Sequence, residues 1–327
     1  MPDTLTAVQY GVGPIGARIV RAAVSRGFEF VGAVDIDPSK VGSDLGAVAD
    51  VGRPLGVTVT DDPAVALDGD EVDVVFLATA SALEAVLPQL RTCLERGIDV
   101  VSTCEQLTYP WYRHPDLAVE LDELATDHGA TVLGTGINPG FAMDFLPAVL
   151  TTPCHDVASV EVVRVQDAAT RREPLQRKVG AGLTFEAFER EIRGREGHVG
   201  LTESVAMLAA TLGWELSDVT ESAEPVVADE PVETAHVSVA PGEVAGTAQR
   251  GVGRVDGEVR IELEISQYVG AADPRDETRI AGDPDLELSI PGGIHGDTAT
   301  PAIVVNRTPH VVDGDPGLAT MIDGVER

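Results

Sequence analysis

Lysine is nearly absent from this chain of 327 residues, in which only Lys40 and Lys178 occur and arginine supplies the other basic side chains. Acidic residues number 54 against 23 basic ones, so the formal net charge at pH 7 is −31. Nucleic-acid-binding proteins need a cationic face, and catalysis by paired lysines needs lysines to choose from. Both functions are therefore excluded, and we expect no nucleic-acid partner.

The acidic residues are spread along the whole chain instead of being gathered in one tail. A uniform acidic surface with few lysines is typical of proteins from a salt-filled cytoplasm, where ions screen the repulsion between like charges. We therefore favour a halophilic protein. The alternative is an ordinary acidic surface, which predicts folding without high salt.

Cysteine and long apolar segments are also scarce. Cys93, Cys104 and Cys154 are odd in number and have no CxxC spacing, which argues against a disulfide framework and favours a reducing compartment. No targeting signal is recognisable at the N-terminus, and the longest apolar stretch, residues 72–80, is too short to cross a bilayer. The seven histidines lack metal-ligand spacing such as HxxxH. These absences predict a cytoplasmic protein without a membrane partner or a bound metal.

The first part of the chain alternates short apolar strands with helices. Strands are expected at 6–10, 28–34, 72–77, 98–102 and 130–133, and helices at 17–25, 81–96 and 115–128. Near-continuous apolar strands that alternate with helices form a parallel sheet covered on both faces. Residues 1–146 are therefore predicted to form an α/β domain with a doubly wound parallel Rossmann sheet.

The pattern changes after Pro147. Helices are expected at 184–193 and 200–212, and strands at 157–165, 215–227, 233–239, 243–255 and 259–269. Consecutive strands predict a second, α+β domain over residues 147–294 with a mainly antiparallel sheet. The charged stretch 271–285 is expected to be a mobile loop. Residues 295–327 are expected to supply a C-terminal helix, at about 297–312, that packs back on the first domain.

Gly11, Gly13 and Gly16 form a GxGxxG pattern between the first expected strand and the first expected helix. In dinucleotide-binding proteins the first glycine makes a tight turn, the second lets a pyrophosphate approach the backbone and the third lets the helix pack on the strand. Pro14 has no N–H, so Gly13, Ile15 and Gly16 would donate to the phosphates at the helix N-terminus. The pattern predicts NAD or NADP as the cofactor; the alternative is a coincidental glycine turn.

Asp35 stands at the end of the second expected strand, where dinucleotide-binding proteins carry an acidic residue that bonds the adenosine ribose. Its charge would lie against a 2′-phosphate, which favours NAD over NADP. Ser39 and Lys40 could reach such a phosphate, so the use of NADP stays open. The alternative for Asp35 is a solvated carboxylate at a strand end.

Three later strand ends belong to the edge where the nicotinamide ring binds in such sheets. Small residues there leave room for a cofactor, or form a plain turn, and the candidates are Ala78, Thr79, Ala80 and Thr103. Asn138 could bind the nicotinamide carboxamide or cap the N-terminus of a helix. The sequence does not decide between these two roles.

Glu105 is the only carboxylate in these strand ends. A carboxylate that is partly desolvated beside an apolar ring has a raised pKa suited to proton transfer. A glutamate at this position could equally lie on the surface, in the first turn of the next helix. Cys104 could be a nucleophile, but a small buried cysteine is favoured because no histidine pairs with it in the pattern.

Six segments, in order from Ala7 to Met321, resemble the 2,4-diaminopentanoate dehydrogenases and the related NAD(P)-dependent amine dehydrogenases, a branch of the dihydrodipicolinate reductase-like fold. They are GVGPIG, VGAVDIDPSKVGSDLG, STCEQL, GTGINPGFAMD, GHVGLTES and PGGIHGDTATPAIVVNRTPHVV. Dihydrodipicolinate reductases proper carry a His-His pair and a Lys-x-Asp-x-Pro-Ser-Gly-Thr segment. Neither occurs here, so that activity is not expected.

The resemblance implies an oxidoreductase that converts a primary amine and NAD(P)⁺ to a ketone or aldehyde and ammonia, and that runs in reverse as reductive amination. It implies that Glu105 is catalytic and that Asn138 lies near the nicotinamide. Phe141 and His198 would lie near the substrate, and the protein would be a homodimer. A substrate carboxylate would need a cation, for which the candidates are Arg164, Arg171, Arg172, Arg177 and Lys178. The alternatives are a cyclic imine reductase and a non-catalytic NAD(P)-binding redox sensor.

Overall fold

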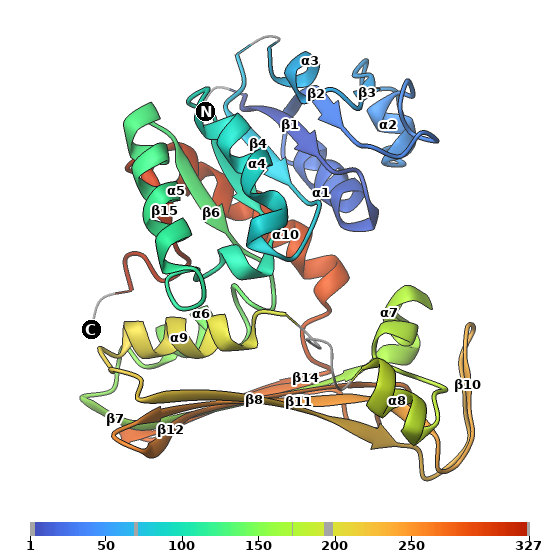
Figure 1. The fold of residues 1–327 in the computed structure, drawn as a ribbon, viewed down its shortest axis with the longest axis vertical. Helices are drawn as coiled ribbons and strands as arrows, with labels where there is room; N and C mark the ends of the chain where they lie inside the picture. Colours follow the sequence, from blue (N-terminus) through green and yellow to red (C-terminus); the bar gives the residue numbers. More distant parts are fainter. Residues whose placement is uncertain (1–3, 69–70, 172, 193–198, 326–327) are drawn as a thin grey trace. The chain divides into compact units, whose positions relative to one another are not determined.

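The computed structural model describes residues 4–68, 71–171, 173–192 and 199–325. The chain forms two compact units (Figure 1). The first comprises Met1–Phe141 and His295–Asp323, and the second comprises Ala142–Ile294 and Gly324–Arg327. The first unit is thus built from two stretches of the chain that are far apart in the sequence.

The first unit contains a seven-stranded sheet in the order β15-β6-β5-β4-β1-β2-β3, and all of its strand pairs are parallel. Its strands are β1 (Thr6–Tyr10), β2 (Glu29–Val34), β3 (Val59–Thr60), β4 (Val74–Leu77), β5 (Asp99–Ser102), β6 (Thr131–Gly134) and β15 (Gly317–Ala319). Every residue of β4 is buried, as expected for a central strand covered on both faces. The predicted doubly wound parallel sheet is confirmed, and β3 and β15 are edge strands that the sequence pattern did not predict.

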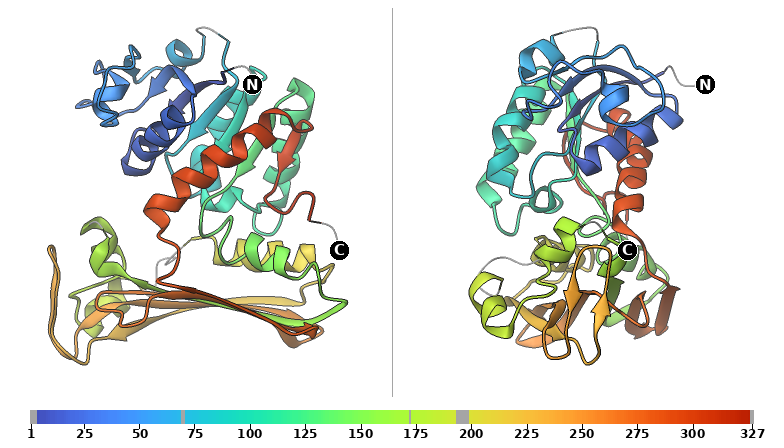
Figure 2. Two further views of the ribbon diagram at one scale, coloured as in Figure 1. Left: turned by 180° about the vertical axis from the view of Figure 1, so that it is seen from behind. Right: turned by 90° about the vertical axis from the view of Figure 1, so that its right-hand side faces the viewer.

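Helices cover both faces of this sheet. The longer ones are α1 (Pro14–Ser25), α4 (Leu83–Leu94), α5 (Pro115–His128) and α10 (Gly296–Val312), and the shorter ones are α2 (Leu45–Val48), α3 (Pro63–Leu67) and the 3₁₀ helix η1 (Glu105–Leu107). Figure 2 shows α1 and α10 on one face and α4 and α5 on the other. Because α10 packs against α1 and against β4, β5 and β6, the predicted return of the terminal helix to the first domain is confirmed.

A large core cluster of the first unit lies between the sheet and helices α4 and α5. Leu83, Val86, Leu90 and Leu94 recur every three or four residues along α4, and all are buried. This spacing gives the helix one apolar face. That face packs in a single cluster with sheet residues such as Val75.

The second unit contains a six-stranded sheet in the order β14-β13-β7-β12-β11-β8. Its strands are β7 (Asp156–Asp167), β8 (Asp218–Val227), β11 (Val244–Val255), β12 (Glu258–Tyr268), β13 (Arg275–Asp283) and β14 (Leu286–Pro291). Only the β7–β12 pair is parallel among the pairs of this sheet, so the predicted mainly antiparallel α+β domain is confirmed. Its helices are α6 (Phe145–Leu150), η2 (Ala168–Thr170), α7 (Glu173–Lys178), α8 (Phe185–Glu191) and α9 (Leu201–Thr211).

Helix α9 packs on β8, β11 and β12. Nearly all of its residues are buried, which is typical of a helix enclosed on several sides. Within the parts of the chain that the structure describes, no helix of either unit is long and apolar enough to cross a membrane.

The single strand expected at 233–239 is a hairpin instead. Its two short strands are β9 (Val232–Glu233) and β10 (Ser238–Val239). Between them the Thr234 hydroxyl accepts the N–H groups of His236 and Val237, at 3.1 and 2.9 Å. The prediction was wrong because these side-chain hydrogen bonds close a turn in a segment whose composition favours a strand.

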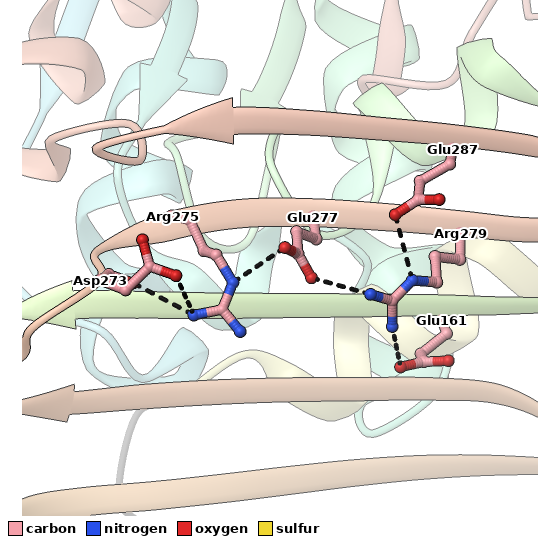
Figure 3. A network of polar contacts seen from close by, with 6 residues as sticks. All are labelled: Glu161, Asp273, Arg275, Glu277, Arg279 and Glu287. Atoms are coloured by element: carbon pink, nitrogen blue, oxygen red, sulfur yellow. Dashed lines mark hydrogen bonds and ion pairs between the residues drawn. The ribbon is translucent and has the colours of Figure 1, made fainter.

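The prediction of a mobile loop at 271–285 is also wrong, because β13 occupies most of this stretch. Asp276, Thr278 and Ile280 alternate with charged residues along β13, and all three are buried. Arg275, Glu277 and Arg279 point to the opposite face, where they form ion pairs with one another and with nearby residues (Figure 3). The network consists of Glu161, Asp273, Arg275, Glu277, Arg279 and Glu287. High charge indicated a loop, although the period of two is that of a strand.

Candidate active site

The glycine pattern forms a tight turn between β1 and α1. Gly11 has a φ of +89°, and a Cβ added there would lie 2.6 Å from the carbonyl oxygen of Ala78. A Cβ at Gly16 would overlap the carbonyl oxygen of Gly11. At Gly13, by contrast, an added Cβ would meet no atom within 4 Å. Gly11 and Gly16 are therefore required by close packing, while Gly13 leaves open space for a ligand.

Helix α1 starts directly after this turn. Its N-cap is Gly13, which supplies no side-chain hydrogen bond, and its first residue is Pro14. The first N–H groups of a helix have no partner within the helix, and they carry the positive end of its dipole. The N–H groups of Ile15 and Gly16 belong to this first turn, so the arrangement suits a pyrophosphate.

Asp35, directly after β2, is tied to the glycine turn. Its Oδ2 accepts from the Val12 N–H at 2.8 Å and pairs with Lys40 Nζ at 3.0 Å, while Oδ1 accepts from the Asp37 N–H at 2.9 Å. Burial raises the pKa of Asp35, but these hydrogen bonds and the Lys40 charge outweigh it and hold the pKa below its usual value. The side chain is only 10% exposed. Asp35 is thus a largely buried, ionised carboxylate rather than a solvated one.

The ends of β1, β4, β5 and β6 lie along one edge of the sheet, because the hydrogen-bond ladder continues past each end. The N–H groups of Ala78, Thr103 and Thr135 donate to the last residues of β1, β4 and β5, at 2.8, 3.0 and 2.8 Å. Thr79 also borders the glycine turn, since its methyl group would lie 2.8 Å from a Cβ at Gly11. The structure therefore brings the small strand-end candidates together beside this turn, with Ala80 next in the chain.

Glu105 begins η1 at the same edge and is half-buried. The next residue, Gln106, anchors η1, because its side-chain oxygen accepts from the Leu83 N–H at 2.9 Å. A Cβ added at Gly134 would lie 2.5 Å from the carbonyl carbon of Leu107, so β6 packs directly on this turn. Glu105 thus stands on a single well-packed turn rather than at the start of a long surface helix.

The three cysteines are buried. Cys104 is 1% exposed, and its Sγ donates to the Ser81 carbonyl at 3.2 Å. Since a nucleophile needs an accessible thiolate, the geometry favours the interpretation of Cys104 as a small packed side chain. In the portion of the chain that is described, no group of three or more His, Cys, Asp or Glu residues could hold a metal ion.

Asn138 lies in the turn after β6 and caps no helix. Helix α6 is capped instead by Asp144, whose side chain accepts from the Phe145 N–H at 2.7 Å. Both Oδ1 and Nδ2 of Asn138 are buried, and neither finds a hydrogen-bond partner in the described ranges. A buried amide without partners is costly, and a carboxamide would offer the matching donor and acceptor. The open glycine turn and this amide therefore fit a nicotinamide dinucleotide.

Two candidates for substrate contact stay predictions, and the structure adds two buried polar residues. Phe141 is half-buried at the end of the first stretch of the first unit, and His198 lies outside the described residues. The sequence interpretation missed Thr135, whose Oγ1 is buried without a hydrogen-bond partner in the described chain, and Gln9, which is buried inside β1. For Gln9 the signal was a polar residue in an apolar strand, and for Thr135 it was the position just after the strand expected at 130–133.

The cationic candidates of the second unit differ in their surroundings. Arg164 is 1% exposed, pairs with Asp276 at 3.2 Å and donates to the Ile294 carbonyl at 2.7 Å. Burial lowers the pKa of Arg164, and the charge of the nearby Arg171 lowers it further. The Asp276 charge acts in the opposite direction and raises the pKa. Arg171 is half-buried. The other candidates are exposed or outside the described ranges, namely Arg177, Lys178 and Arg172.

Two family models match most of the chain. Residues 141–325 match the 2,4-diaminopentanoate dehydrogenase C-terminal domain, and residues 8–105 match the N-terminus of dihydrodipicolinate reductase. The two models therefore correspond to different parts of the same chain.

Individual proteins agree with these matches. The chain is 34% identical over 318 residues to a 2,4-diaminopentanoate dehydrogenase from Acetoanaerobium sticklandii, covering 89% of each protein. It is 24% identical to an amine dehydrogenase from Streptomyces virginiae, over 98% of this chain and 96% of the relative. The solved structure of an amine dehydrogenase from Mycobacterium smegmatis superposes with a TM-score of 0.84 and 30% identity, covering 98% of this chain and 96% of that one. The resemblance noted in the sequence is confirmed, and this chain belongs to the 2,4-diaminopentanoate dehydrogenase family.

Proposed function

We propose that this protein is an NAD(P)-dependent amine dehydrogenase that oxidises a primary amine to a ketone or aldehyde, releases ammonia and also catalyses the reverse reductive amination. The observation that carries this proposal is the position of Glu105, half-buried on η1 at the sheet edge that also bears the glycine turn. The unsatisfied amide of Asn138 at the same edge supports it. Membership of the family, whose relatives are named for this chemistry, supports it independently.

In this proposal the first unit holds the cofactor. The N–H groups of Gly13, Ile15 and Gly16 bind the pyrophosphate, Asp35 binds the adenosine ribose and Asn138 binds the carboxamide. The small side chains after β4, with Thr103, border the nicotinamide. When bound, the nicotinamide supplies the acceptor for a hydride.

Glu105 carries the proton transfers. An ammonium has no free lone pair, so it must lose a proton before the carbon–nitrogen double bond can form. The carboxylate of Glu105 binds the ammonium, takes that proton and then assists the water that adds to the carbon. A carboxylate also binds cationic amines in preference to neutral alcohols. Phe141 and His198 are retained as candidates for substrate contact.

We propose NAD as the preferred cofactor, with NADP also accepted. Asp35 carries a negative charge where a 2′-phosphate would lie, which favours NAD. Lys40 pairs with that carboxylate at 3.0 Å and so offsets part of its repulsion. The ratio of kcat/KM for the two cofactors, with the same amine, measures the preference.

For the substrate we propose 2,4-diaminopentanoate or a closely similar amino acid. A substrate carboxylate needs a cationic partner, and Arg164 and Arg171 lie near one another in the second unit. If no cation contacts the substrate, a simple alkyl amine is oxidised better than the amino acid. Comparing the oxidation rates of amino acids and alkyl amines distinguishes these two possibilities.

The test is the growth of nicotinamide absorbance at high salt with NAD⁺ or NADP⁺ and a panel of 2,4-diaminopentanoate and short primary amines. We expect Glu105→Gln to bind nucleotide normally but to lose at least about 100-fold in kcat/KM. Glu84→Gln, in an exposed glutamate of the first turn of α4, is the matched control and should retain full activity. If folded, nucleotide-binding protein oxidises no amine, the proposal fails and reduction of a cyclic imine is tested next.

We also propose that the protein acts in the cytoplasm as a homodimer and without a nucleic-acid partner. Three cysteines without CxxC spacing support a reducing compartment, and the net charge of −31 opposes binding to a polyanion. The homodimer rests on the family resemblance. Light scattering in solution, which measures the mass of the particle, tests it directly.

A further inference from the structure

Gln9 is a polar residue in the interior of the first unit. It is the fourth residue of β1 and is 0% exposed, while its neighbours in the strand are apolar. Burial of an amide is unfavourable unless its polar atoms find partners. The position therefore needs a reason beyond packing.

The Gln9 side chain uses its donor and not its acceptor. Its Nε2 donates to the Gly11 carbonyl at 2.9 Å and to the Phe76 carbonyl of β4 at 3.2 Å. Its Oε1 is buried and has no hydrogen-bond partner in the described part of the chain. What this site needs is a donor to two carbonyl groups, one of which belongs to the glycine turn.

The peptide between Gly11 and Val12 is held at both ends. Its carbonyl oxygen, on Gly11, accepts from Gln9, and its N–H, on Val12, donates to Asp35 Oδ2 at 2.8 Å. Rotation of this peptide plane would break both hydrogen bonds together. A glycine with positive φ has little intrinsic preference between such orientations, so side chains have to select one.

The orientation of that peptide affects the adjoining part of the turn. The N–H of Gly11 is held by the Val34 carbonyl at 2.8 Å, and Gly13, the open position, follows two residues later. Gly16 packs against the Gly11 carbonyl so closely that no side chain fits there. The Gly11 carbonyl thus lies between Gln9 and the first turn of α1.

We propose that Gln9 is a positioning residue for the dinucleotide. By locking the Gly11–Val12 peptide together with Asp35, it keeps the glycine turn ready for the pyrophosphate before the cofactor arrives. This role rests on the binding of NAD(P) in the proposed function, but not on the oxidation of an amine. It acts on nucleotide affinity and not on the chemical step.

The test compares two variants that lose a buried amide. Gln9→Met keeps nearly the same volume and removes the donor. Gln176→Met is the matched control, because Gln176 is also 0% exposed and its Nε2 donates to the Ala169 and Arg171 carbonyls in the second unit, at 3.2 and 2.8 Å. Calorimetric titration with NAD⁺ and NADP⁺, without any amine present, gives the Kd, and thermal unfolding gives the stability of each variant.

We expect Gln9→Met to raise the Kd for NAD⁺ about tenfold, with kcat at saturating cofactor within about twofold of the unaltered protein. Gln176→Met should lower the unfolding midpoint and leave the Kd unchanged. A folded Gln9→Met with the original Kd would overturn the proposal and leave Gln9 a purely structural residue. The titration uses no amine, so the two proposals can fail separately. A protein that binds nucleotide but oxidises no amine would refute the proposed function and leave this inference intact.

A second measurement needs no variant. Hydrogen exchange of the Val12 amide in the nucleotide-free protein reports whether the peptide is held before binding. We expect this amide to be protected. Exchange at the rate of an unstructured chain would show that the lock is absent and would overturn the proposal, even if Gln9→Met does not fold.

Discussion

At the scale of single residues, Asp99 is a partly buried carboxylate, and burial disfavours its charged form. It begins β5, and its Oδ1 accepts from the Thr131 N–H at 2.7 Å. Burial and, secondarily, the nearby charge of Asp73 raise the pKa of Asp99 to about 6, although the Thr131 hydrogen bond lowers it. Asp99 therefore titrates close to neutral pH in the folded protein.

This pKa predicts how stability depends on pH. The folded-state pKa lies above the ordinary value of about 4, so the folded protein binds more protons than the unfolded chain between these values. The contribution of Asp99 to stability is fully present below about pH 4 and is lost as the pH rises through about 6. We expect Asp99→Asn, which stays neutral and can still accept from Thr131, to raise the free energy of unfolding at pH 7 by about 1 kcal/mol, a value discounted for partial exposure.

Denaturant unfolding of both proteins between pH 4 and pH 7 measures this difference. The matched control is Asp127→Asn, in an exposed residue of α5, which should leave the slope with pH unchanged. An Asp99→Asn protein with the same slope as the unaltered protein would refute the assignment.

The sequence predicted the role of a residue correctly where that role depends only on neighbouring residues in the chain. The strand, the glycine turn and the helix are contiguous, so the roles of Gly11 and Gly16 in packing were predictable from their spacing. The two interpretations of Asn138 could not be separated in the same way, because they differ in burial and in the partners of the amide. The same holds for Gln9, whose second acceptor belongs to Phe76 on another strand.

At the scale of elements, the contact between β6 and η1 sets the position of Glu105. The backbone of Gly134 lies against Leu107, and an added Cβ would come within 2.5 Å of the Leu107 carbonyl carbon. Such an overlap involves backbone on both sides and cannot be relieved by a side-chain rotation. Any side chain at Gly134 must therefore displace the turn that begins with Glu105.

We expect Gly134→Ala to lower the free energy of unfolding by about 1–3 kcal/mol and to reduce kcat at least about tenfold, because a displaced carboxylate transfers protons poorly. Gly129→Ala is the matched control. Gly129 ends α5 with a φ of +69° and open space around it, so alanine there costs stability without touching η1. Denaturant unfolding and steady-state rates of both variants measure the two effects, and equal kcat values for the two would show that η1 tolerates the shift.

The failed prediction at 271–285 concerns a segment whose charged side chains find partners on neighbouring strands. Arg279 forms ion pairs with Glu161 of β7 and Glu287 of β14, at 3.2 and 3.4 Å. Such charges are solvated side chains on an outer face of the sheet, and local composition cannot distinguish them from a charged loop. The apolar strands of the first unit were predictable because their burial is visible in the residues themselves.

At the scale of the whole molecule, the net charge of −31 predicts a dependence on salt. The Debye length falls from about 10 Å at 0.1 M salt to about 3 Å at 1 M, which screens the repulsion between exposed carboxylates. Salt also weakens exposed ion pairs, but each of these contributes little. We propose that the protein is halophilic and expect the midpoint of thermal unfolding to rise by about 5 °C or more over this range.

Sucrose at the same osmolality is the control, because it does not screen charge. A midpoint that is unchanged or falls with potassium chloride would mean an ordinary acidic surface. Light scattering over the same salt series shows whether the homodimer persists when repulsion between copies is strongest.

The division of the first unit into two stretches has a consequence for biosynthesis. Helix α10 and strand β15 are made after the inserted stretch Ala142–Ile294, yet α10 covers β4, β5 and β6, and β15 pairs with β6. A ribosome that has released only residues 1–141 has therefore produced a nucleotide-binding sheet with one face partly bare and one edge unpaired. The inserted stretch Ala142–Ile294 of the second unit is synthesised before the stretch His295–Asp323 that completes the first unit. Until α10 and β15 have been made, this face and this edge of the nascent sheet are exposed to solvent and to chaperones.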